Sequence, residues 1–273
     1  MYESELCGIT AAAREAGRII LSAADGENAK AVTEKEGSAN FVTKYDKRVQ
    51  EYLFSSLAKI FPDAVFIGEE DEGEHRHVLE KGLSFIIDPI DGTTNFIRDM
   101  KNSFVSVGLL DRGEPIIGVA YDPYFDRMYT AVKGGGAYLD GVRISTVKRS
   151  IDKAIILFGT SPYYKDTLAD ITFDIAKELF MLGADLRRSG SSVSDFMSVS
   201  CGSADLFFEA MLSPWDYAAS SLIIKEAGGE ICTFEGKPVT YDGGCPILAS
   251  SSRELAEIAL GVIAKCEKNT YGI

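Results

Sequence analysis

Residues 84–96 read Ser-Phe-Ile-Ile-Asp-Pro-Ile-Asp-Gly-Thr-Thr-Asn-Phe, and this stretch decides how the rest of the chain is interpreted. Its apolar run ends at Asp88, Pro89 and Asp91, a pattern that predicts a buried strand followed by a loop. Pro89 restricts its own φ and biases Asp88 toward an extended conformation, so both aspartates can point to one place. Two such carboxylates repel each other unless a cation lies between them, and a hard divalent metal ion is the simplest candidate.

The residues after Asp91 add a possible anion site. Gly92, Thr93 and Thr94 offer backbone N–H groups that can approach an anion closely, with two hydroxyl groups beside them. The stretch therefore predicts a metal ion and a phosphate group in one loop. The structural alternative is that Asp-Gly forms an ordinary turn and that Asp88 only caps the residues that follow.

The run Asp-Pro-Ile-Asp-Gly-Thr-Thr-Asn-Phe at residues 88–96 resembles, without departure, the metal-binding signature of the inositol monophosphatase family. The wider superfamily includes fructose-bisphosphatases, histidinol-phosphate phosphatases and 3′(2′),5′-bisphosphate nucleotidases. The nucleotidases usually have Lys-Glu at the positions of Thr94 and Asn95, which argues against that activity here. The resemblance extends over about residues 5 to 265 and implies an α/β fold, a layered αβαβα sandwich that often forms a homodimer.

The composition is that of a globular protein with an acidic surface. The 273 residues are 46% hydrophobic, which is enough to bury the core of one large domain or of two fused halves. A formal charge of −13 argues against a nucleic-acid or anionic membrane partner. An acidic protein that handles phosphate esters needs local positive charge, which bound metal would supply.

The cysteines and the N-terminus indicate a compartment. The five cysteines show no CxxC spacing and are odd in number, so neither a zinc site nor a disulfide framework is predicted. The sequence begins Met-Tyr-Glu-Ser-Glu, without the character of a signal peptide, and contains no apolar run of membrane-spanning length. We therefore expect a soluble protein of the reducing cytoplasm.

The hydrophobic periodicity predicts a first half, residues 1–147, of α+β type with helices packed on an antiparallel sheet. Helices are expected over 3–23 and 47–60, and strands over 64–68, 103–111, 115–121 and 127–132, with a short hairpin at 138–143. This half would carry most of the metal ligands.

The second half, residues 148–273, alternates strands with helices, which predicts an α/β layer. Strands are expected at 153–158, 184–188, 204–209, 230–234 and 246–250, and helices at 166–182, 191–201, 214–227 and 252–267. No Pro/Gly/Ser-rich linker separates the halves, so we expect them to pack as one catalytic unit.

Glu69 and Glu70 open an acidic run that could be only a solvated loop. However, a carboxylate directly after a buried strand can lie at the same sheet edge as Asp88. Gly-Glu-Glu is also the second metal motif of the family, which makes Glu69 a metal ligand and Glu70 a supporting or weaker one. His75 and His77 could bind a transition metal, but a mobile surface loop explains them better, and they are left out of the site.

Asp46 suits the N-cap of the helix expected at 47–60. In the family, the aspartate of a Val-Thr-x-x-Asp segment hydrogen-bonds the loop threonine that activates water, and an upstream lysine lies beside the metals. The resemblance maps these residues to Asp46, Thr93 and Lys35.

Asp216 lies in the first turn of a predicted helix, where an acid normally interacts with the helix dipole. In the family a Trp-Asp pair opens a helix that aims its aspartate at the second metal, so Asp216 would complete a cluster with Asp88 and Asp91. The resemblance also places Glu209 where the family has a glutamate that binds a substrate hydroxyl.

One segment departs from the family. Residues 190–193 read Gly-Ser-Ser-Val where Gly-Ser/Thr-Ala-Ala is common. This region normally contacts the alcohol part of the substrate, so Ser191 and Ser192 are candidate substrate contacts. The departure bears on the preference for inositol or sugar phosphates and leaves the metal ligands intact.

The resemblance implies a phosphoric monoester hydrolase that uses two or three Mg²⁺ ions and is sensitive to lithium. Oxygen ligands, which Mg²⁺ prefers, would come from Glu69, Asp88, the Ile90 carbonyl, Asp91 and Asp216. Glu69 and Thr93, the latter oriented by Asp46, would activate a water for in-line displacement without a covalent enzyme intermediate. The expected substrate contacts are Asp91, Gly92, Thr93, Ser191, Ser192, Glu209 and Asp216.

Inositol monophosphate is the expected substrate. Fructose-1,6-bisphosphate and histidinol phosphate are alternatives, and a bisphosphate nucleotide is less favoured. A hypothesis of another class is a metal-binding regulatory protein without turnover, which gains little support because every expected ligand is present in the sequence.

Overall fold

The strand that carries Asp88 lies inside a seven-stranded sheet. The computed structural model describes residues 3–23, 33–34, 41–71, 79 and 82–271. The sheet order is β3 (Val65–Gly68), β4 (Leu83–Asp91), β5 (Phe104–Asp111), β6 (Glu114–Asp122), β7 (Arg127–Val132), β8 (Gly136–Leu139) and β9 (Val142–Ile144). β3 pairs parallel with β4 and every later pair is antiparallel, which confirms the predicted meander.

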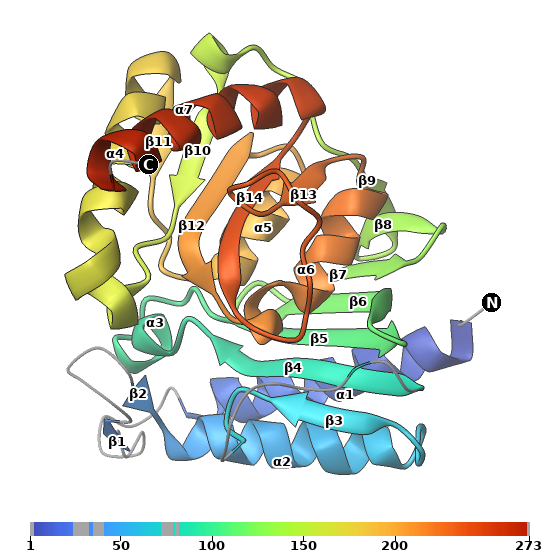
Figure 1. Ribbon diagram of the computed structural model, residues 1–273. Coiled ribbons are helices and arrows are strands. Elements are labelled where there is room, and N and C mark those ends of the chain that lie inside the picture. The colour runs from blue at the N-terminus through green and yellow to red at the C-terminus, as the bar shows by residue number, and fades with distance from the viewer. Residues whose placement is uncertain (1–2, 24–32, 35–40, 72–78, 80–81, 272–273) are drawn as a thin grey trace.

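Two helices cover one face of this sheet, as the lower part of Figure 1 shows. They are α1 (Glu3–Leu21) and α2 (Lys44–Ala58), both predicted from their apolar spacing. Ile9 and Ile20 of α1 and Leu53 of α2 are buried with Phe85 and Ile87 of β4 in one cluster. Between these helices, β1 (Thr33–Glu34) and β2 (Phe41–Val42) form a two-stranded antiparallel pair.

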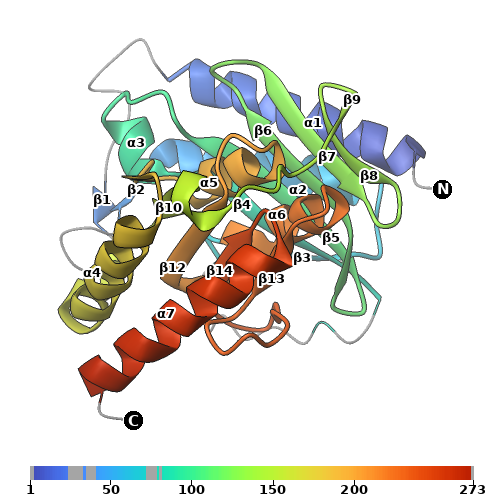
Figure 2. The same ribbon diagram turned by 90° about the horizontal axis from the view of Figure 1, so that it is seen from above.

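The second half forms a five-stranded sheet with helices on its outer face. The order is β11 (Asp185–Arg187), β10 (Ile155–Phe158), β12 (Leu206–Leu212), β14 (Cys245–Ser250) and β13 (Glu230–Cys232), with the first three strands parallel. α4 (Lys165–Leu182) and α7 (Arg253–Tyr271) lie on the outer face of this sheet (Figure 2), where Ile175 and Ile263 are buried. Two short 3₁₀ turns, η2 (Ile151–Lys153) and η3 (Pro162–Tyr164), flank β10.

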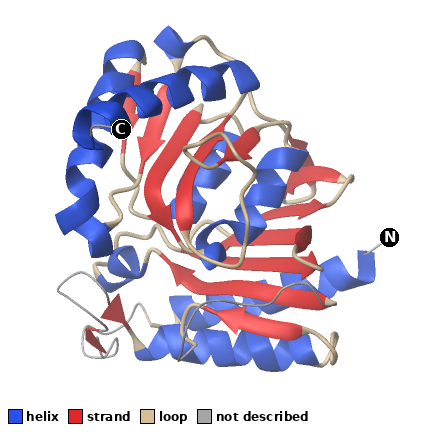
Figure 3. Ribbon diagram, in the orientation of Figure 1, coloured by secondary structure: helices blue, strands red, loops and turns tan. Residues whose placement is uncertain are grey.

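The helices α5 (Ser192–Ser200) and α6 (Pro214–Glu226) lie between the two sheets, as the alternating red and blue layers of Figure 3 show. Their buried side chains share one cluster with both sheets, for example Phe196 and Ile223 with Ile86 of β4 and Phe207 of β12. The layers therefore run helix, sheet, helix, sheet, helix, and the predicted αβαβα sandwich is confirmed. The proposed division at residues 147/148 falls between the last strand of one sheet and the first strand of the other.

A pair of glycines lets α6 lie directly on the seven-stranded sheet. Gly108 of β5 and Gly118 of β6 are partners across the two strands. A Cβ atom at Gly118 would lie 2.5 Å from the carbonyl oxygen of Ala219, and one at Gly108 would lie 3.0 Å from the Cβ of Ala218. Because these two positions have no side chains, the helix that carries Asp216 can lie close to the sheet.

Two local predictions were wrong in detail. Asp46 is not the N-cap, because α2 begins earlier: Thr43 has the extended cap conformation and its hydroxyl accepts from the N–H of Tyr45. Asp46 instead closes a reciprocal capping box with Thr43. The loop expected after Asp88 is also absent, because β4 continues through a register shift to Asp91, and the short helix α3 (Thr93–Ile97) follows.

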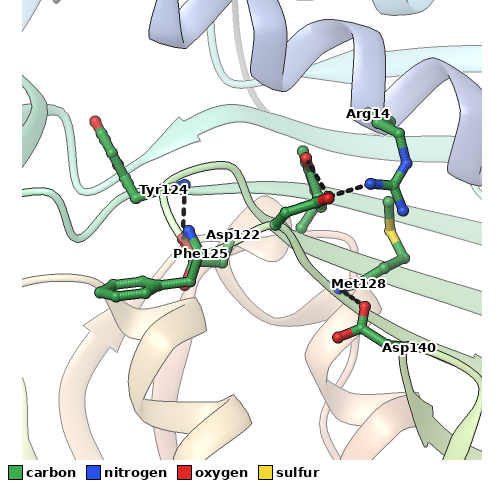
Figure 4. Close-up of polar contacts among 8 residues, drawn as sticks. Arg14, Asp122, Tyr124, Phe125, Met128 and Asp140 are labelled. Atoms are coloured by element: carbon green, nitrogen blue, oxygen red, sulfur yellow. Dashed lines mark hydrogen bonds and ion pairs between the residues drawn. The ribbon is translucent and has the colours of Figure 1, made fainter.

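The turn between β6 and β7 is tied to α1 (Figure 4). Arg14 forms an ion pair with Asp126, which also accepts a hydrogen bond of 2.9 Å from the Tyr121 hydroxyl. At the end of β6, Asp122 accepts from the N–H groups of Tyr124 and Phe125 in the turn. In the part of the chain that the structure describes, no helix has the length and apolar character needed to cross a membrane.

Candidate metal centre

Three carboxylates from distant parts of the chain meet beside the end of β4. One oxygen from each of Asp88, Asp91 and Asp216 lies within 4.8 Å of the others. Asp88 and Asp91 are buried in β4, and Asp216 is in the first turn of α6. The ion pairs formed by described residues include none of the three. A compact set of oxygen donors that forms no ion pair with a described Lys or Arg fits a hard divalent cation.

The electrostatics of the cluster favour added positive charge. Burial raises the pKa of Asp88 well above its usual value, and the charges of Glu69, Asp91 and Asp216 raise it further. Burial also raises the pKa of Asp216 well above its usual value, with added contributions from Asp91 and Glu69. Like charges in a buried site resist ionisation together, so a cation would stabilise the carboxylate forms.

The N-terminus of α5 holds Asp91 through both of its oxygens. Oδ1 accepts from the N–H of Ser192 at 3.2 Å and from its hydroxyl at 3.0 Å. Oδ2 accepts from the N–H of Val193 at 3.1 Å and from the Ser191 hydroxyl. Burial raises the pKa of Asp91, and the hydrogen bonds from Ser191 and Ser192 oppose that rise. The predicted substrate contacts Ser191 and Ser192 therefore bind a candidate metal ligand in this structure.

Asp216 interacts with the start of its own helix and also lies close to two carboxylates from a distant strand. Ser213 is the N-cap of α6, and its N–H donates to Oδ2 of Asp216 at 2.7 Å. The same carboxylate faces Asp88 and Asp91 closely enough to belong to their cluster. The structural explanation of Asp216 as a helix-start acid and its placement at the candidate metal centre are therefore both compatible with the geometry.

Thr93 links the cluster to Asp46. Its hydroxyl lies 3.3 Å from Oδ1 of Asp46 and 3.2 Å from the carbonyl oxygen of Ile90. The other oxygen of Asp46 accepts from the Thr43 N–H at 2.7 Å and from the Thr43 hydroxyl at 2.5 Å. Burial raises the pKa of Asp46 to about 6, the bonds from Thr43 lower it, and the charge of Glu70 raises it. The structure therefore brings Asp46 and Thr93 together, as the family resemblance predicts.

Gly92 allows the chain to turn sharply between β4 and α3. Its φ is +84°, a left-handed conformation that favours glycine. A Cβ atom there would also lie 3.1 Å from the carbonyl oxygen of Asn102 and 3.2 Å from the Cβ of Ser191. The turn thus leaves room for the segment before α5 to close over the end of β4.

The two acids after β3 lie beside the same sheet edge. The N–H of Glu69 donates to the carbonyl oxygen of Ile87 at 3.2 Å, which holds Glu69 next to β4. Its charge acts on Asp88, although its carboxylate is outside the group of three oxygens within 4.8 Å. The N–H of Glu70 donates to the side chain of Gln50 at 3.0 Å. Lys35, His75 and His77 lie outside the described residues.

Glu209 of β12 is buried near the cluster and is held by Ser161. Its Oε1 accepts from the N–H of Ser161 at 2.8 Å and from its hydroxyl at 3.3 Å. Burial raises the pKa of Glu209 to about 7, the bonds from Ser161 lower it, and the charge of Asp91 raises it. Sequence reasoning missed both Ser161 and Gly159, where a Cβ would lie 1.8 Å from Oε2 of Glu209.

Tyr163 is a further neighbour that the sequence did not single out. It belongs to η3, two residues after Ser161, and its side chain is half-exposed. Burial raises the pKa of its hydroxyl, and the charges of Glu69, Asp216 and Asp88 add to the rise. Its only possible sequence signal was its place after β10, near the turn that holds Glu209.

Comparisons with known proteins identify the family to which the chain is similar. The model of the inositol monophosphatase family matches residues 2–268. The chain is 37% identical over 226 residues to a protein named Nus factor SuhB from Salmonella typhimurium strain 14028s, covering 82% of this chain and 83% of that one. It is 32% identical over 217 residues to the inositol-1-monophosphatase of Bacillus subtilis, covering 80% and 81%. The crystal structure of extragenic suppressor protein suhB from Bartonella henselae superposes with a TM-score of 0.86 at 27% identity, covering 96% of this chain and 99% of that one.

Proposed function

Because the chain belongs to the inositol monophosphatase family and is a phosphatase of that family, we propose that it hydrolyses a small phosphate monoester, inositol monophosphate in the first place, with the help of Mg²⁺. The observation that carries the proposal is the convergence of Asp88, Asp91 and Asp216 beside the Thr93–Asp46 pair. Carboxylates alone would repel a phosphate group, whereas carboxylates that hold cations can bind one.

The residues that would hold Mg²⁺ are Glu69, Asp88, the Ile90 carbonyl, Asp91 and Asp216. When bound, two or three such ions supply the positive charge that acidifies a water molecule and stabilises a departing alkoxide. The fit rests on the donor set: every candidate ligand atom is an oxygen, and three of the carboxylates already lie within reach of one ion.

Thr93 and Glu69 would prepare the attacking water. The Thr93 hydroxyl can donate its hydrogen to Asp46 or to the Ile90 carbonyl oxygen, which leaves an oxygen lone pair free to accept from a water. Glu69 would then accept the proton that the water loses. The N–H groups of Gly92 and Thr93 would hold the phosphoryl oxygens. Because the attacking group would be a water, the displacement would be in line and would form no covalent enzyme intermediate.

Glu209 would recognise the alcohol part of the substrate. Its Oε1 is occupied by two bonds from Ser161, so Oε2 is the oxygen left to accept from a hydroxyl of a polyol. The inositol-1-monophosphatase of Bacillus subtilis, among the relatives of this chain, supports inositol monophosphate as the first substrate to test.

The deciding experiment measures phosphate release from inositol-1-phosphate, fructose-1,6-bisphosphate, histidinol phosphate and adenosine 3′,5′-bisphosphate, each with Mg²⁺ and with EDTA. We expect release that is fastest with inositol-1-phosphate and that EDTA abolishes. Release from none of these esters, by protein that still binds Mg²⁺, would favour a regulatory protein without turnover. Release that EDTA leaves unchanged would overturn the metal-dependent mechanism.

Three further properties belong to the same proposal. Lithium inhibition and a homodimer follow from the family resemblance, and inhibition assays and sedimentation velocity test them. A cytoplasmic location is supported by the five cysteines, all of which are unpaired in the structure. Fractionation of cells that express the tagged full-length chain would test that location.

A further inference from the structure

Four hydrogen bonds from the start of α5 reach the carboxylate of Asp91. An ionised carboxylate offers about four lone-pair sites, two on each oxygen. Four donors of α5 fill them: the Ser192 N–H and hydroxyl on Oδ1, and the Val193 N–H and Ser191 hydroxyl on Oδ2. A cation that is to be ligated by Asp91 must therefore share or replace one of these donors.

Three of the four donors are fixed by the fold. The N–H groups of Ser192 and Val193 belong to the first turn of α5 and have no carbonyl partner within the helix. The hydroxyl of Ser191 also serves as the N-cap, because it accepts from the N–H of Ser194 at 3.1 Å. Moving any of these donors would disturb the start of the helix.

The hydroxyl of Ser192 is different. Among the described residues, its one hydrogen bond is to Oδ1 of Asp91, and rotation about the Cα–Cβ bond would remove it. The residue is at the first position of α5, where alanine is compatible with the helix. Position 192 is also one of the two positions, with 193, at which this chain departs from the Gly-Ser/Thr-Ala-Ala pattern.

We propose that the Ser192 hydroxyl competes with a divalent cation for Asp91: it donates to Oδ1 in the structure, and it rotates away when that oxygen ligates the ion. The inference rests on the proposed Mg²⁺-dependent function and adds a residue that sets the affinity for the ion. Because the hydroxyl competes with the ion for one oxygen, its removal makes Mg²⁺ binding tighter while leaving Asp91 with fewer partners in the metal-free protein.

The test is isothermal titration of metal-stripped, full-length protein with MgCl₂. Ser192→Ala is expected to bind Mg²⁺ about tenfold more tightly than the natural protein, which corresponds to about 1.4 kcal/mol. Ser192→Thr keeps a hydroxyl and is expected to bind as the natural protein does. Ser194→Ala is the matched control, because it removes a hydroxyl from the same turn that makes no hydrogen bond among the described residues.

A second readout is the melting temperature without metal. Metal-free Ser192→Ala is expected to melt at a lower temperature than the natural protein, because a buried carboxylate has lost one donor. Saturating Mg²⁺ is expected to remove this difference. Ser192→Gly lacks the hydroxyl as well and replaces Ser192→Ala in both measurements if the alanine variant does not fold.

The possible outcomes distinguish a failure of this inference from a failure of the proposed Mg²⁺-dependent function. If the natural protein binds Mg²⁺ and Ser192→Ala binds it equally or more weakly, the hydroxyl is no competitor and the inference is overturned while the proposed function stands. An equal gain in Ser194→Ala would also overturn it, because the effect would then be general to the start of α5. If neither the natural protein nor any of the variants binds Mg²⁺, the proposed function itself is wrong.

Discussion

Replacing Asp88 by asparagine is expected to stabilise the metal-free protein and to remove its response to Mg²⁺. Asparagine has the same shape as aspartate, and its side-chain oxygen can still accept the 2.9 Å hydrogen bond from the N–H of Ile90. It also removes the negative charge of Asp88, which the charges of Asp91 and Asp216 repel. The same change deletes the carboxylate at the centre of the candidate ligand set.

The magnitude follows from the spacing of the cluster. Two unit charges 4.8 Å apart repel each other by about 3 kcal/mol at an effective dielectric constant of about 20. We therefore expect a gain of up to about 3 kcal/mol in the free energy of unfolding for the metal-free variant at pH 8. In the natural protein, Mg²⁺ at about a hundred times its Kd raises the free energy of unfolding by about 2.7 kcal/mol. This corresponds to a rise of roughly 5 to 10 °C in Tm.

The assay is thermal unfolding of both proteins in EDTA and in Mg²⁺, with phosphate release measured on the same samples. Asp122→Asn is the control, because Asp122 is a buried aspartate at the end of β6 and is not a member of the carboxylate cluster. The control should keep its Mg²⁺ response and its activity. An Asp88→Asn protein that is active and is stabilised by Mg²⁺ as the natural protein is would refute the shared-ligand reasoning.

Three other changes test the surrounding residues. Thr93→Val keeps the shape of the side chain but loses the hydroxyl that reaches Asp46, so phosphate release should fall about 10²-fold or more with Mg²⁺ affinity little changed; a normal kcat would exclude a role in orienting water. The pKa of Glu209 is about 7 in the folded protein and about 4.5 in the unfolded chain. The folded protein therefore binds the proton more tightly, which contributes about 3 kcal/mol to the free energy of unfolding below pH 4.5. This contribution is lost as the pH rises through 7. Urea unfolding of metal-free Glu209→Gln should therefore depend less on pH between 5 and 8, and parallel curves for the two proteins would contradict this. Gly118→Ala places a Cβ 2.5 Å from the Ala219 carbonyl oxygen, so α6 must shift; we expect a Tm lower by several degrees and weaker Mg²⁺ binding, and a variant unchanged in both would show that the close contact is unimportant.

The sequence by itself determined the secondary structure and the set of candidate ligands. Apolar spacing identified α1 and α2, and the alternation of strands and helices identified the second sheet, because both patterns are local consequences of which face of an element is buried. The resemblance pointed to Asp88 and Asp91 through residues 88–96 and to Asp216 through the Trp-Asp pair at 215–216, and the structure brings these three together.

Only the tertiary structure decided how those ligands are held. The donors that fill Asp91 come from residues about a hundred positions further along the chain, and the contact has no trace in the spacing of either segment. The same is true of Ser161 on Glu209 and of the glycine pair beneath α6. Side-chain partners and close backbone approaches depend on how separate elements pack in three dimensions, whereas the periodicity of a sequence records only which side of each element faces the core.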